Sequence, residues 1–107
     1  MEETPSLRMR QIELMLQKEP NDTFLLYGLA LELKKANESR RAIEQLDRVI
    51  GLDAGYCYAY FQKGQILESA GDVEGAKAVY RQGMAAATEK GDAHARKELE
   101  TALHDIE

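Results

Sequence analysis

The 107-residue sequence contains one cysteine, two prolines and no tryptophan. The single cysteine, Cys57, has no partner for an internal disulfide, and this favours a reducing compartment. The sequence also lacks any run of about 18 apolar residues, so no membrane-spanning helix is expected. Residues 1–5 are acidic and polar, whereas a secretory signal begins with a basic region and an apolar core. We therefore expect a cytoplasmic protein.

Other missing features narrow the function. The net charge of −5 argues against nucleic acid or an anionic membrane as the main partner. There is no glycine-rich phosphate loop, and no nucleophile, base and orienting residue are grouped by spacing, so we expect no enzyme activity and no cofactor. Two histidine–glutamate pairs, His94 with Glu98 and Glu100 with His104, have helical spacing. Each pair offers two ligands where zinc needs three or four, so no metal site is expected.

The positive evidence in the sequence is helical periodicity. Apolar residues recur at helical spacing in six segments, and no segment shows the strict alternation of a half-buried strand. The clearest stripe, at i, i+3, i+4 and i+7, is Leu26, Leu29, Ala30 and Leu33. The fold class is therefore all-α, and the length fits a single domain of residues 1–107.

Residue types at the segment ends predict where the helices start and stop. Thr4 and Pro5 are expected to open the first helix, as N-cap and first helical residue, and Pro20 to end it. Aspartates are expected to cap three later helices, and asparagine or glycine to follow helices in the left-handed conformation. These residues are Asp22, Asp72, Asp92, Asn37, Gly71 and Gly91.

Helix pairs recur with a period of 34 residues. Between the two full repeats, three pairs of identical residues are separated by this distance: Leu33 and Leu67, Ala36 and Ala70, and Ala42 and Ala76. Small residues, which let paired helices approach closely, alternate with large residues that fill the space beside them. The small residues are Ala30, Ala42, Gly64, Ala76 and Gly83, and the large ones are Leu26, Leu46, Tyr60 and Tyr80.

This pattern resembles the tetratricopeptide repeat (TPR), a helix–turn–helix unit of 34 residues. In the second repeat, the family's positions are taken by Tyr60, Lys63, Gly64 and Leu67, and then by Ala76, Tyr80 and Gly83. The resemblance implies a right-handed solenoid of one half repeat, two full repeats and a capping helix. The expected ranges are 4–19 for the half-repeat helix, 22–54 and 56–88 for the full repeats, and 92–106 for the capping helix. The Met1 start and the capping helix favour a complete chain.

The concave face of a TPR stack is lined by the first helix of each pair, and the resemblance implies a partner-binding site there. Aromatic side chains with polar ones between them suit peptide recognition, because they supply large contact area at low entropic cost. The alternative is that Tyr27 and Phe61 pack against the capping helix or against each other. The expected partner-binding residues are Phe24, Tyr27, Leu31, Tyr58, Phe61, Gln62 and Gln65.

Some TPR proteins hold a C-terminal carboxylate with a clamp of lysine and asparagine side chains. The matching positions here are Tyr27, Leu31, Gln62, Asp92 and Arg96. Only Arg96 fits, so binding of chaperone tails is not expected, although Arg96 stays a candidate partner contact. The polar outer face of the capping helix is expected to carry Arg96, Lys97, Glu98 and Glu100.

A second function stays open because of two leucines on the first helix. Leu7 and Leu14 lie about 200° around this helix from Ile12, and they are expected to face the helix that the half repeat lacks. Such an edge could make the protein a self-associating structural subunit, such as a homodimer. The leading hypothesis is a monomeric module that binds a protein or peptide, whereas the alternative predicts a mass that depends on concentration.

Overall fold

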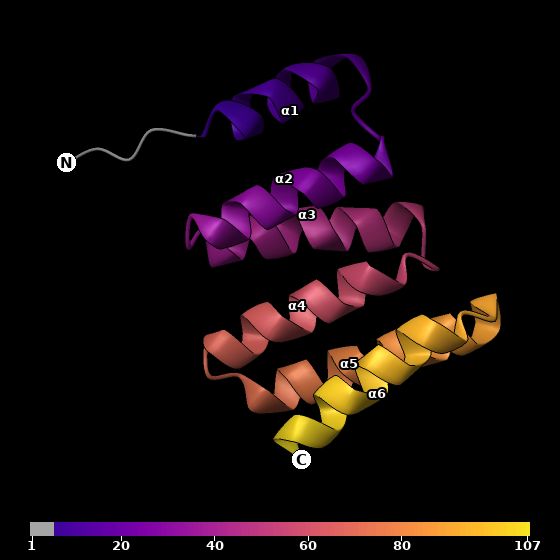
Figure 1. Cartoon of the computed structure of the whole chain (residues 1–107). Helices are drawn as coiled ribbons and strands as arrows, with labels where there is room; N and C mark the ends of the chain where they lie inside the picture. The colour runs from indigo at the N-terminus through magenta and orange to yellow at the C-terminus, as the bar shows by residue number, and fades with distance from the viewer. Residues whose placement is uncertain (1–5) are drawn as a thin grey trace.

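The computed structural model describes residues 6–107, and it forms six α-helices (Figure 1). The helices are α1 (Leu7–Lys18), α2 (Thr23–Lys35), α3 (Ser39–Leu52), α4 (Cys57–Ser69), α5 (Val73–Lys90) and α6 (Ala93–Ile106). This arrangement confirms the all-α class. Across the described chain, none of the helices combines the length and apolar character that a membrane span requires.

The helix ends follow the residue types that predicted them. Each of the three N-cap aspartates accepts a hydrogen bond from the backbone N–H three residues further on. Asn37, Gly71 and Gly91 follow their helices with positive φ angles of 61°, 86° and 79°. Local sequence therefore sets most of the turns between helices.

The start of α1 differs from the prediction. The helix begins at Leu7 rather than near Thr4, and Ser6 is its N-cap. The Ser6 hydroxyl accepts a hydrogen bond from the third helical N–H at 3.0 Å and donates one to Glu32 of α2 at 3.1 Å. This second bond, which the sequence did not indicate, fixes the N-cap to the neighbouring helix. Thr4 and Pro5 lie outside the described residues.

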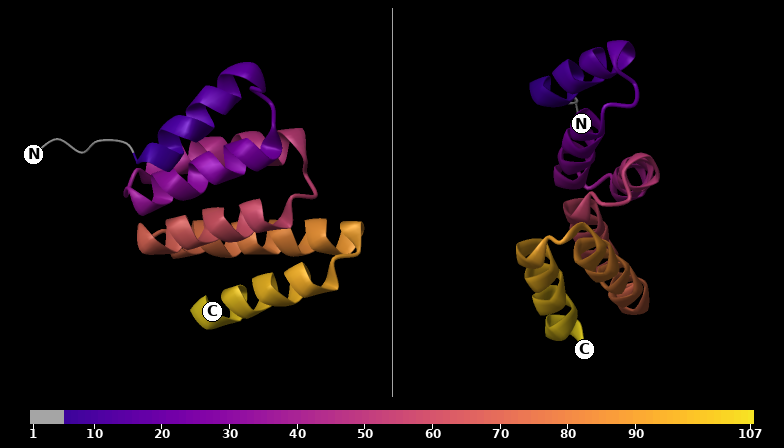
Figure 2. Two further views of the ribbon diagram at one scale, coloured as in Figure 1. Left: turned by 45° about the horizontal axis from the view of Figure 1, so that its top comes forward. Right: turned by 90° about the vertical axis from the view of Figure 1, so that its right-hand side faces the viewer.

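The six helices pack mainly as consecutive neighbours. The helices of each full pair, α2 with α3 and α4 with α5, lie side by side, and α6 packs on α5 and also touches α4. α1 packs on α2 much as α3 packs on α4. Viewed end-on, α3 and α5 lie on one side of the stack and α6 on the other (Figure 2, right). The helices α2, α4 and α6 therefore line one surface, which we call the concave face.

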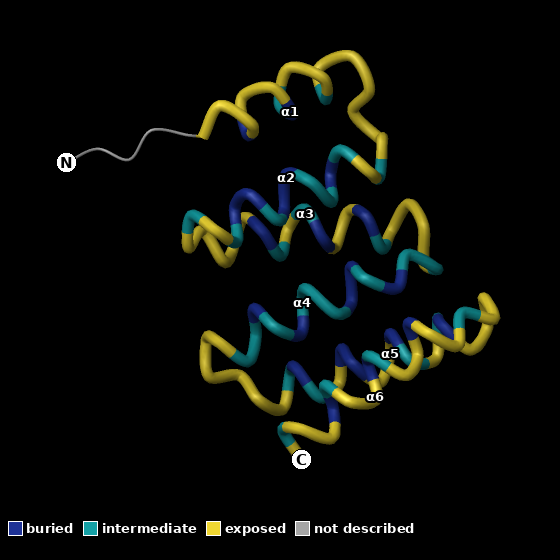
Figure 3. The backbone as a smooth tube through the Cα atoms, in the orientation of Figure 1, coloured by how far each residue is buried: buried dark blue, intermediate teal, exposed yellow. Residues whose placement is uncertain are grey.

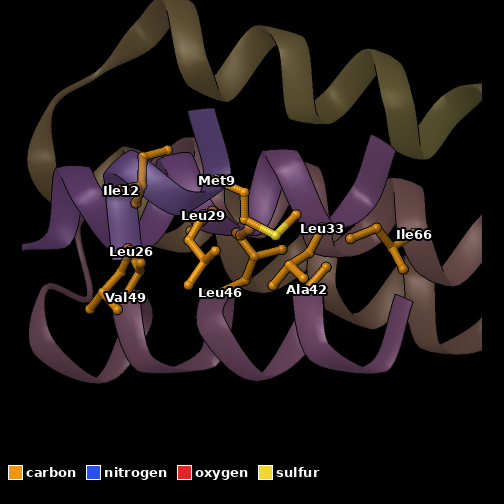
Figure 4. Close-up of a cluster of buried hydrophobic side chains, with 11 residues drawn as sticks. Met9, Ile12, Leu26, Leu29, Leu33, Ala42, Leu46, Val49 and Ile66 are labelled. Atoms are coloured by element: carbon orange, nitrogen blue, oxygen red, sulfur yellow. The ribbon is translucent and has the colours of Figure 1, made fainter. Parts of the chain in front are cut away.

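Two clusters of buried side chains hold the stack together. The first joins α1 to α4 around Leu26 and Leu46, which are fully buried. Figure 4 shows Met9 and Ile12 of α1 reaching down to this cluster. The second cluster joins α4, α5 and α6 around the fully buried ring of Tyr80. α1 shares only part of the first cluster and is exposed along most of its length (Figure 3).

Close approach within the pair α4 and α5 depends on two glycines. A Cβ atom added at Gly64 would lie 2.2 Å from Cε1 of Tyr80, and one added at Gly83 would lie 2.8 Å from Cβ of Tyr60. Both distances are well inside van der Waals contact, so these positions require glycine in the present packing. The alternation of small and large residues in the sequence has this physical basis.

Candidate partner-binding site

The concave face carries a cleft of about 620 Å³ between α4 and α6, which we call the α4–α6 cleft. One wall is a stripe on α4 at i, i+4 and i+7, and the other wall is α6. The ring of Tyr80 from α5 lies beneath them. The residues lining the cleft are Phe61, Gln65, Glu68, Tyr80, His94, Lys97, Glu98, Thr101, Ala102 and Asp105.

The apolar part of this cleft is built from two aromatic rings. The ring centroids of Phe61 and Tyr80 are 6.2 Å apart, and the rings are tilted by 49°. The Tyr80 hydroxyl donates a hydrogen bond of 2.5 Å to Oε2 of Glu68. Burial, together with this bond to a carboxylate, raises the pKa of Tyr80 well above its ordinary value, so the phenol keeps its proton. Tyr80 therefore fixes the Glu68 carboxylate in place.

The α6 wall is anchored through Glu98. Its Oε1 atom accepts a hydrogen bond from the Tyr58 hydroxyl at 3.4 Å and lies 2.5 Å from Nε2 of His94. Burial raises the pKa of Tyr58, and the nearby Glu98 charge raises it further. These contacts hold the Glu98 carboxylate at the edge of the cleft.

The acidic side chains that line the α4–α6 cleft outnumber the basic ones. Three carboxylates line it, from Glu68, Glu98 and Asp105, and one cation, from Lys97. A partner segment that places an apolar side chain on Phe61 and a cationic group beside these carboxylates would match it in shape and charge.

A second cleft, of about 270 Å³, lies at the other end of the concave face between α1 and α2, and we call it the α1–α2 cleft. Two of its apolar side chains are open to solvent, Phe24 at 73% and Met15 at 48% exposure. Among the residues that the structure describes, Arg8 is the only charged one in its lining. The full lining is Arg8, Gln11, Ile12, Met15, Phe24, Leu25, Tyr27, Gly28 and Leu31.

The aromatic ring on the inner side of this cleft is partly packed within the protein. The ring centroids of Tyr27 and Tyr56 are 5.1 Å apart, with an angle of 36° between the planes. Burial raises the pKa of both phenols. Tyr27 thus contributes one surface to the cleft and uses the other to join α2 to the start of α4.

Lys34 lies between the two clefts. Its ammonium group donates hydrogen bonds to Oε1 of Gln62 at 2.7 Å and to Oε1 of Gln65 at 2.8 Å. Burial lowers the pKa of Lys34 from its ordinary value. This bridge ties α2 to α4 across the concave face.

The residues expected to bind a partner are therefore divided into groups. Phe24, Tyr27 and Leu31 line the α1–α2 cleft, and Phe61 and Gln65 line the α4–α6 cleft. Gln62 accepts its hydrogen bond at the Lys34 bridge. Tyr58 is half-buried against Glu98, and Arg96 is exposed and lines neither cleft.

Sequence reasoning missed the α6 side chains that line the α4–α6 cleft. Lys97 and Glu98 were expected on its outer face, but both line the α4–α6 cleft. The available signal was a polar stripe at i, i+4, i+7 and i+11, which runs beside the buried stripe of the same helix. The polar stripe is His94, Glu98, Thr101 and Asp105, and the buried one is Ala95, Leu99 and Leu103.

Leu7, Leu14 and Cys57 line neither cleft. Leu7 and Leu14 are 70% and 61% exposed on α1. Cys57 is buried, and burial raises the pKa of its thiol, so it has little thiolate at neutral pH. Its environment is that of an inert core thiol.

Comparisons with known proteins agree with this architecture. Residues 58–90 match the model of the tetratricopeptide repeat. The chain is 32% identical over 96 residues to the TPR repeat-containing protein PA0015 of Pseudomonas aeruginosa, covering 90% of this chain and 91% of that protein. The paired helices thus define a helical-repeat protein, and the chain belongs to the TPR family.

Solved structures show the same fold. The protein BPP2914 of Bordetella parapertussis superposes with a TM-score of 0.82 at 26% identity, over 94% of this chain and 88% of that one. The TPR2B domain of yeast Sti1, in its complex with pHsp70, superposes with a TM-score of 0.84 at 16% identity, over 92% and 78% of the two chains. TPR domains are in general protein–protein interaction modules.

Proposed function

We propose that this protein binds a segment of another protein on its concave face and has no catalytic activity. The observation that carries the proposal is the α4–α6 cleft, where the half-buried Phe61 lies among charged side chains that another chain can contact. An aromatic anchor surrounded by polar groups is the usual composition of an interaction hot spot. The proposed contacts are Phe24, Tyr27, Leu31, Tyr58, Phe61, Gln62, Gln65 and Arg96.

Two further points support the proposal. The similar TPR2B domain of yeast Sti1 forms a complex with pHsp70, so a stack of this shape can hold another protein. Two of the three carboxylates of the α4–α6 cleft, those of Glu98 and Glu68, are already oriented by Tyr58 and Tyr80, so binding would order few additional side chains there. A cytoplasmic location is part of the same proposal.

The test is capture of partners from a lysate of the source organism, with three baits. The wild-type chain and Leu52→Ala, which alters an exposed α3 side chain outside both clefts, should hold the same prey. Phe61→Ala should weaken binding of that prey at least about tenfold, or about 1.4 kcal/mol. Circular dichroism would confirm that all three baits fold. Equal capture by Phe61→Ala would contradict the proposal.

Self-association through α1 is the second candidate function. The observation that favours it is the exposure of Leu7 and Leu14, two large apolar side chains that are one heptad apart on α1. If this edge pairs with a second copy, sedimentation should show a mass that rises with concentration and returns to the monomer in Leu14→Lys. A constant monomer mass for the wild-type chain would exclude this candidate.

A further inference from the structure

Each residue of α1 has a counterpart in α3, 34 residues further along the chain. Comparing the two helices shows a part of α1 that no other described helix covers. Ile12 corresponds to Leu46 and Met15 corresponds to Val49. In α3, Leu46 and Val49 are fully buried in the cluster shared with α2, and Figure 4 shows Val49 beside Leu26. In α1, Met15 is 48% exposed. α1 therefore has the surface of a second repeat helix but no first helix covering it among the described residues.

The surface of α2 beside this part of α1 also has no helix packed against it among the described residues. Gly28 and Leu31 correspond to Gln62 and Gln65 of α4. Those two glutamines face the preceding first helix, because they accept hydrogen bonds from Lys34 of α2. Gly28 and Leu31 instead line the α1–α2 cleft. The cleft thus lies where the first helix of the α1 repeat would pack.

This comparison corrects one expectation from the sequence. Leu7 and Leu14 were expected to face the absent helix. Their counterparts in α3 are Arg41 and Arg48, and both are exposed. The vacant position is therefore on the Met15 side of α1, and the Leu7 and Leu14 edge is a separate surface.

We infer that the α1–α2 cleft receives an amphipathic helix from another protein, and that this helix completes the repeat to which α1 belongs. The inference rests on the proposed function, since the cleft is part of the same concave face, and it adds the kind of segment that binds there. A docked helix would cover Met15 and Phe24, which are the two most exposed apolar side chains of the cleft lining. Helix binding in an apolar groove is read as anchors at i, i+3, i+4 and i+7.

The packing within the full repeats specifies the anchors. In α4, Gly64 lies against Tyr80, and the counterpart of Tyr80 in α1 is Ile12. The α2 residue at the position of Gly64 is Ala30, which is also small. Ile12 already packs against Gly28 of α2 and is only 5% exposed. The docked helix should therefore carry a small residue where it crosses Ile12, with large apolar residues on either side of it, as α2 itself does.

The geometry of the repeat sets the direction of the docked helix, and the charge near the start of α1 indicates which residues suit its C-terminal turn. The two helices of a repeat run in opposite directions, so the C-terminus of the docked helix would lie near the start of α1. Arg8 is in the first turn there, and its side chain is 68% exposed. Arg8 and Lys35 of α2 share one carboxylate, that of Glu32, at 3.5 Å and 3.2 Å, so these three side chains keep one net positive charge. A cation at this place favours the negative end of the helix dipole and an acidic side chain in the last turn. The occupant is therefore an apolar helix with an acidic C-terminal turn.

A second copy of this chain fits the cleft less well. Of the six described helices, α1 alone has a large free apolar edge, and it carries Arg8, Arg10 and Lys18 against the single acid Glu13. That helix would bring positive charge to the cleft residue Arg8, and like charges across an interface disfavour association.

The experiment uses a fluorescently labelled peptide of residues 22–35 in which Lys34→Glu and Lys35→Glu supply the acidic turn. Its stripe already has the required sizes, and fluorescence anisotropy would measure its binding to the full chain. We expect saturable binding, weakened at least about tenfold by Met15→Asp. The matched control is Leu52→Asp, because Leu52 is also 48% exposed but lines no part of the cleft. The same peptide with Ala30→Leu should also bind at least about tenfold more weakly.

A second comparison tests the charge. Arg8→Gln should weaken binding of the glutamate peptide several-fold more than binding of the unmodified peptide with its two lysines. Absence of saturable binding, or equal binding to Met15→Asp and Leu52→Asp, would overturn the inference. So would a dimer of the free chain that Met15→Asp dissociates, since a second copy would then fill the cleft. Binding lost only in Phe61→Ala would place the peptide in the α4–α6 cleft, which overturns the inference and leaves the proposed function intact.

Discussion

The ring of Tyr80 occupies the space that any side chain at Gly64 would need. A Cβ atom at Gly64 would be 2.2 Å from the ring. Because Tyr80 is fully buried, the ring has no free space into which it could move. The Tyr80 hydroxyl also donates a hydrogen bond to Glu68, which lies on α4 one turn after Gly64. One aromatic residue of α5 thus sets both the spacing of the α4–α5 pair and the position of a carboxylate in the α4–α6 cleft.

Gly64→Ala should destabilise the protein although alanine favours a helix. Alanine gains about 1 kcal/mol in intrinsic helix preference, but overpacking a well-packed core costs about 1–3 kcal/mol or more. Because the overlap is with a fully buried ring, we expect a net loss of about 2 kcal/mol in the free energy of unfolding. Gly51→Ala is the matched control, since nothing lies within 4 Å of its added Cβ in α3, and it should be neutral or stabilising. Denaturant unfolding would measure both variants, and equal effects would refute the packing argument.

Glu32 should hold α1 to the stack in a manner that depends on pH. Its side chain is 8% exposed, accepts hydrogen bonds from Ser6 and Lys35, and lies 3.5 Å from Arg8. Burial alone would raise the pKa of Glu32, but the bonds from Lys35 and Ser6 and the charges of Lys35 and Arg8 outweigh it and lower the pKa. The folded pKa is therefore below the unfolded one.

A carboxyl group with a lowered folded pKa stabilises the fold above its ordinary pKa, near 4.3, and loses this contribution as pH falls through the folded value. We expect α1 amides to lose protection from hydrogen exchange in acid before α4 and α5 amides do. Glu32→Gln should cost about 1–3 kcal/mol near neutral pH and remove this part of the acid sensitivity. Uniform loss of protection across all six helices would contradict this role.

The sequence predicted the helices better than it predicted the site. Helix ends depend on local residues such as Asn37 and Gly71, so the pattern was sufficient to find them. The concave face followed from the 34-residue period. Its division into two clefts did not, because the Lys34 bridge joins side chains from different repeats and depends on their conformations in the folded chain. Likewise, the bond from Ser6 to Glu32 spans 26 positions and has no local signal.

The five tyrosines should make the protein sensitive to alkali. Burial raises the pKa of all five above the ordinary value near 10. Their stabilising contribution is complete below that value and is lost as pH rises through it, since the unfolded chain ionises first. We expect tyrosinate absorbance and helix loss to change together in one cooperative step above about pH 10. Tyrosinate absorbance that rises while the helical signal stays constant would show that the phenols ionise in the folded state.

The Lys34 bridge should couple the two full repeats energetically. Lys34→Met keeps the buried stem but removes the hydrogen bonds to Gln62 and Gln65, and bonds from a charged group contribute about 1.5–3 kcal/mol before the cost of burying that charge is subtracted. We expect a net loss of about 1 kcal/mol in stability.

A double-mutant cycle of Lys34→Met with Gln62→Ala and Gln65→Ala together should give a coupling energy of at least about 0.5 kcal/mol. Lys63, whose salt bridge to Asp47 is partly exposed, provides the control, because Lys63→Met should show no coupling to the same glutamines. If the Lys34 cycle gives no more coupling than the Lys63 cycle, the bridge does not couple the two repeats and only shapes the surface between the clefts.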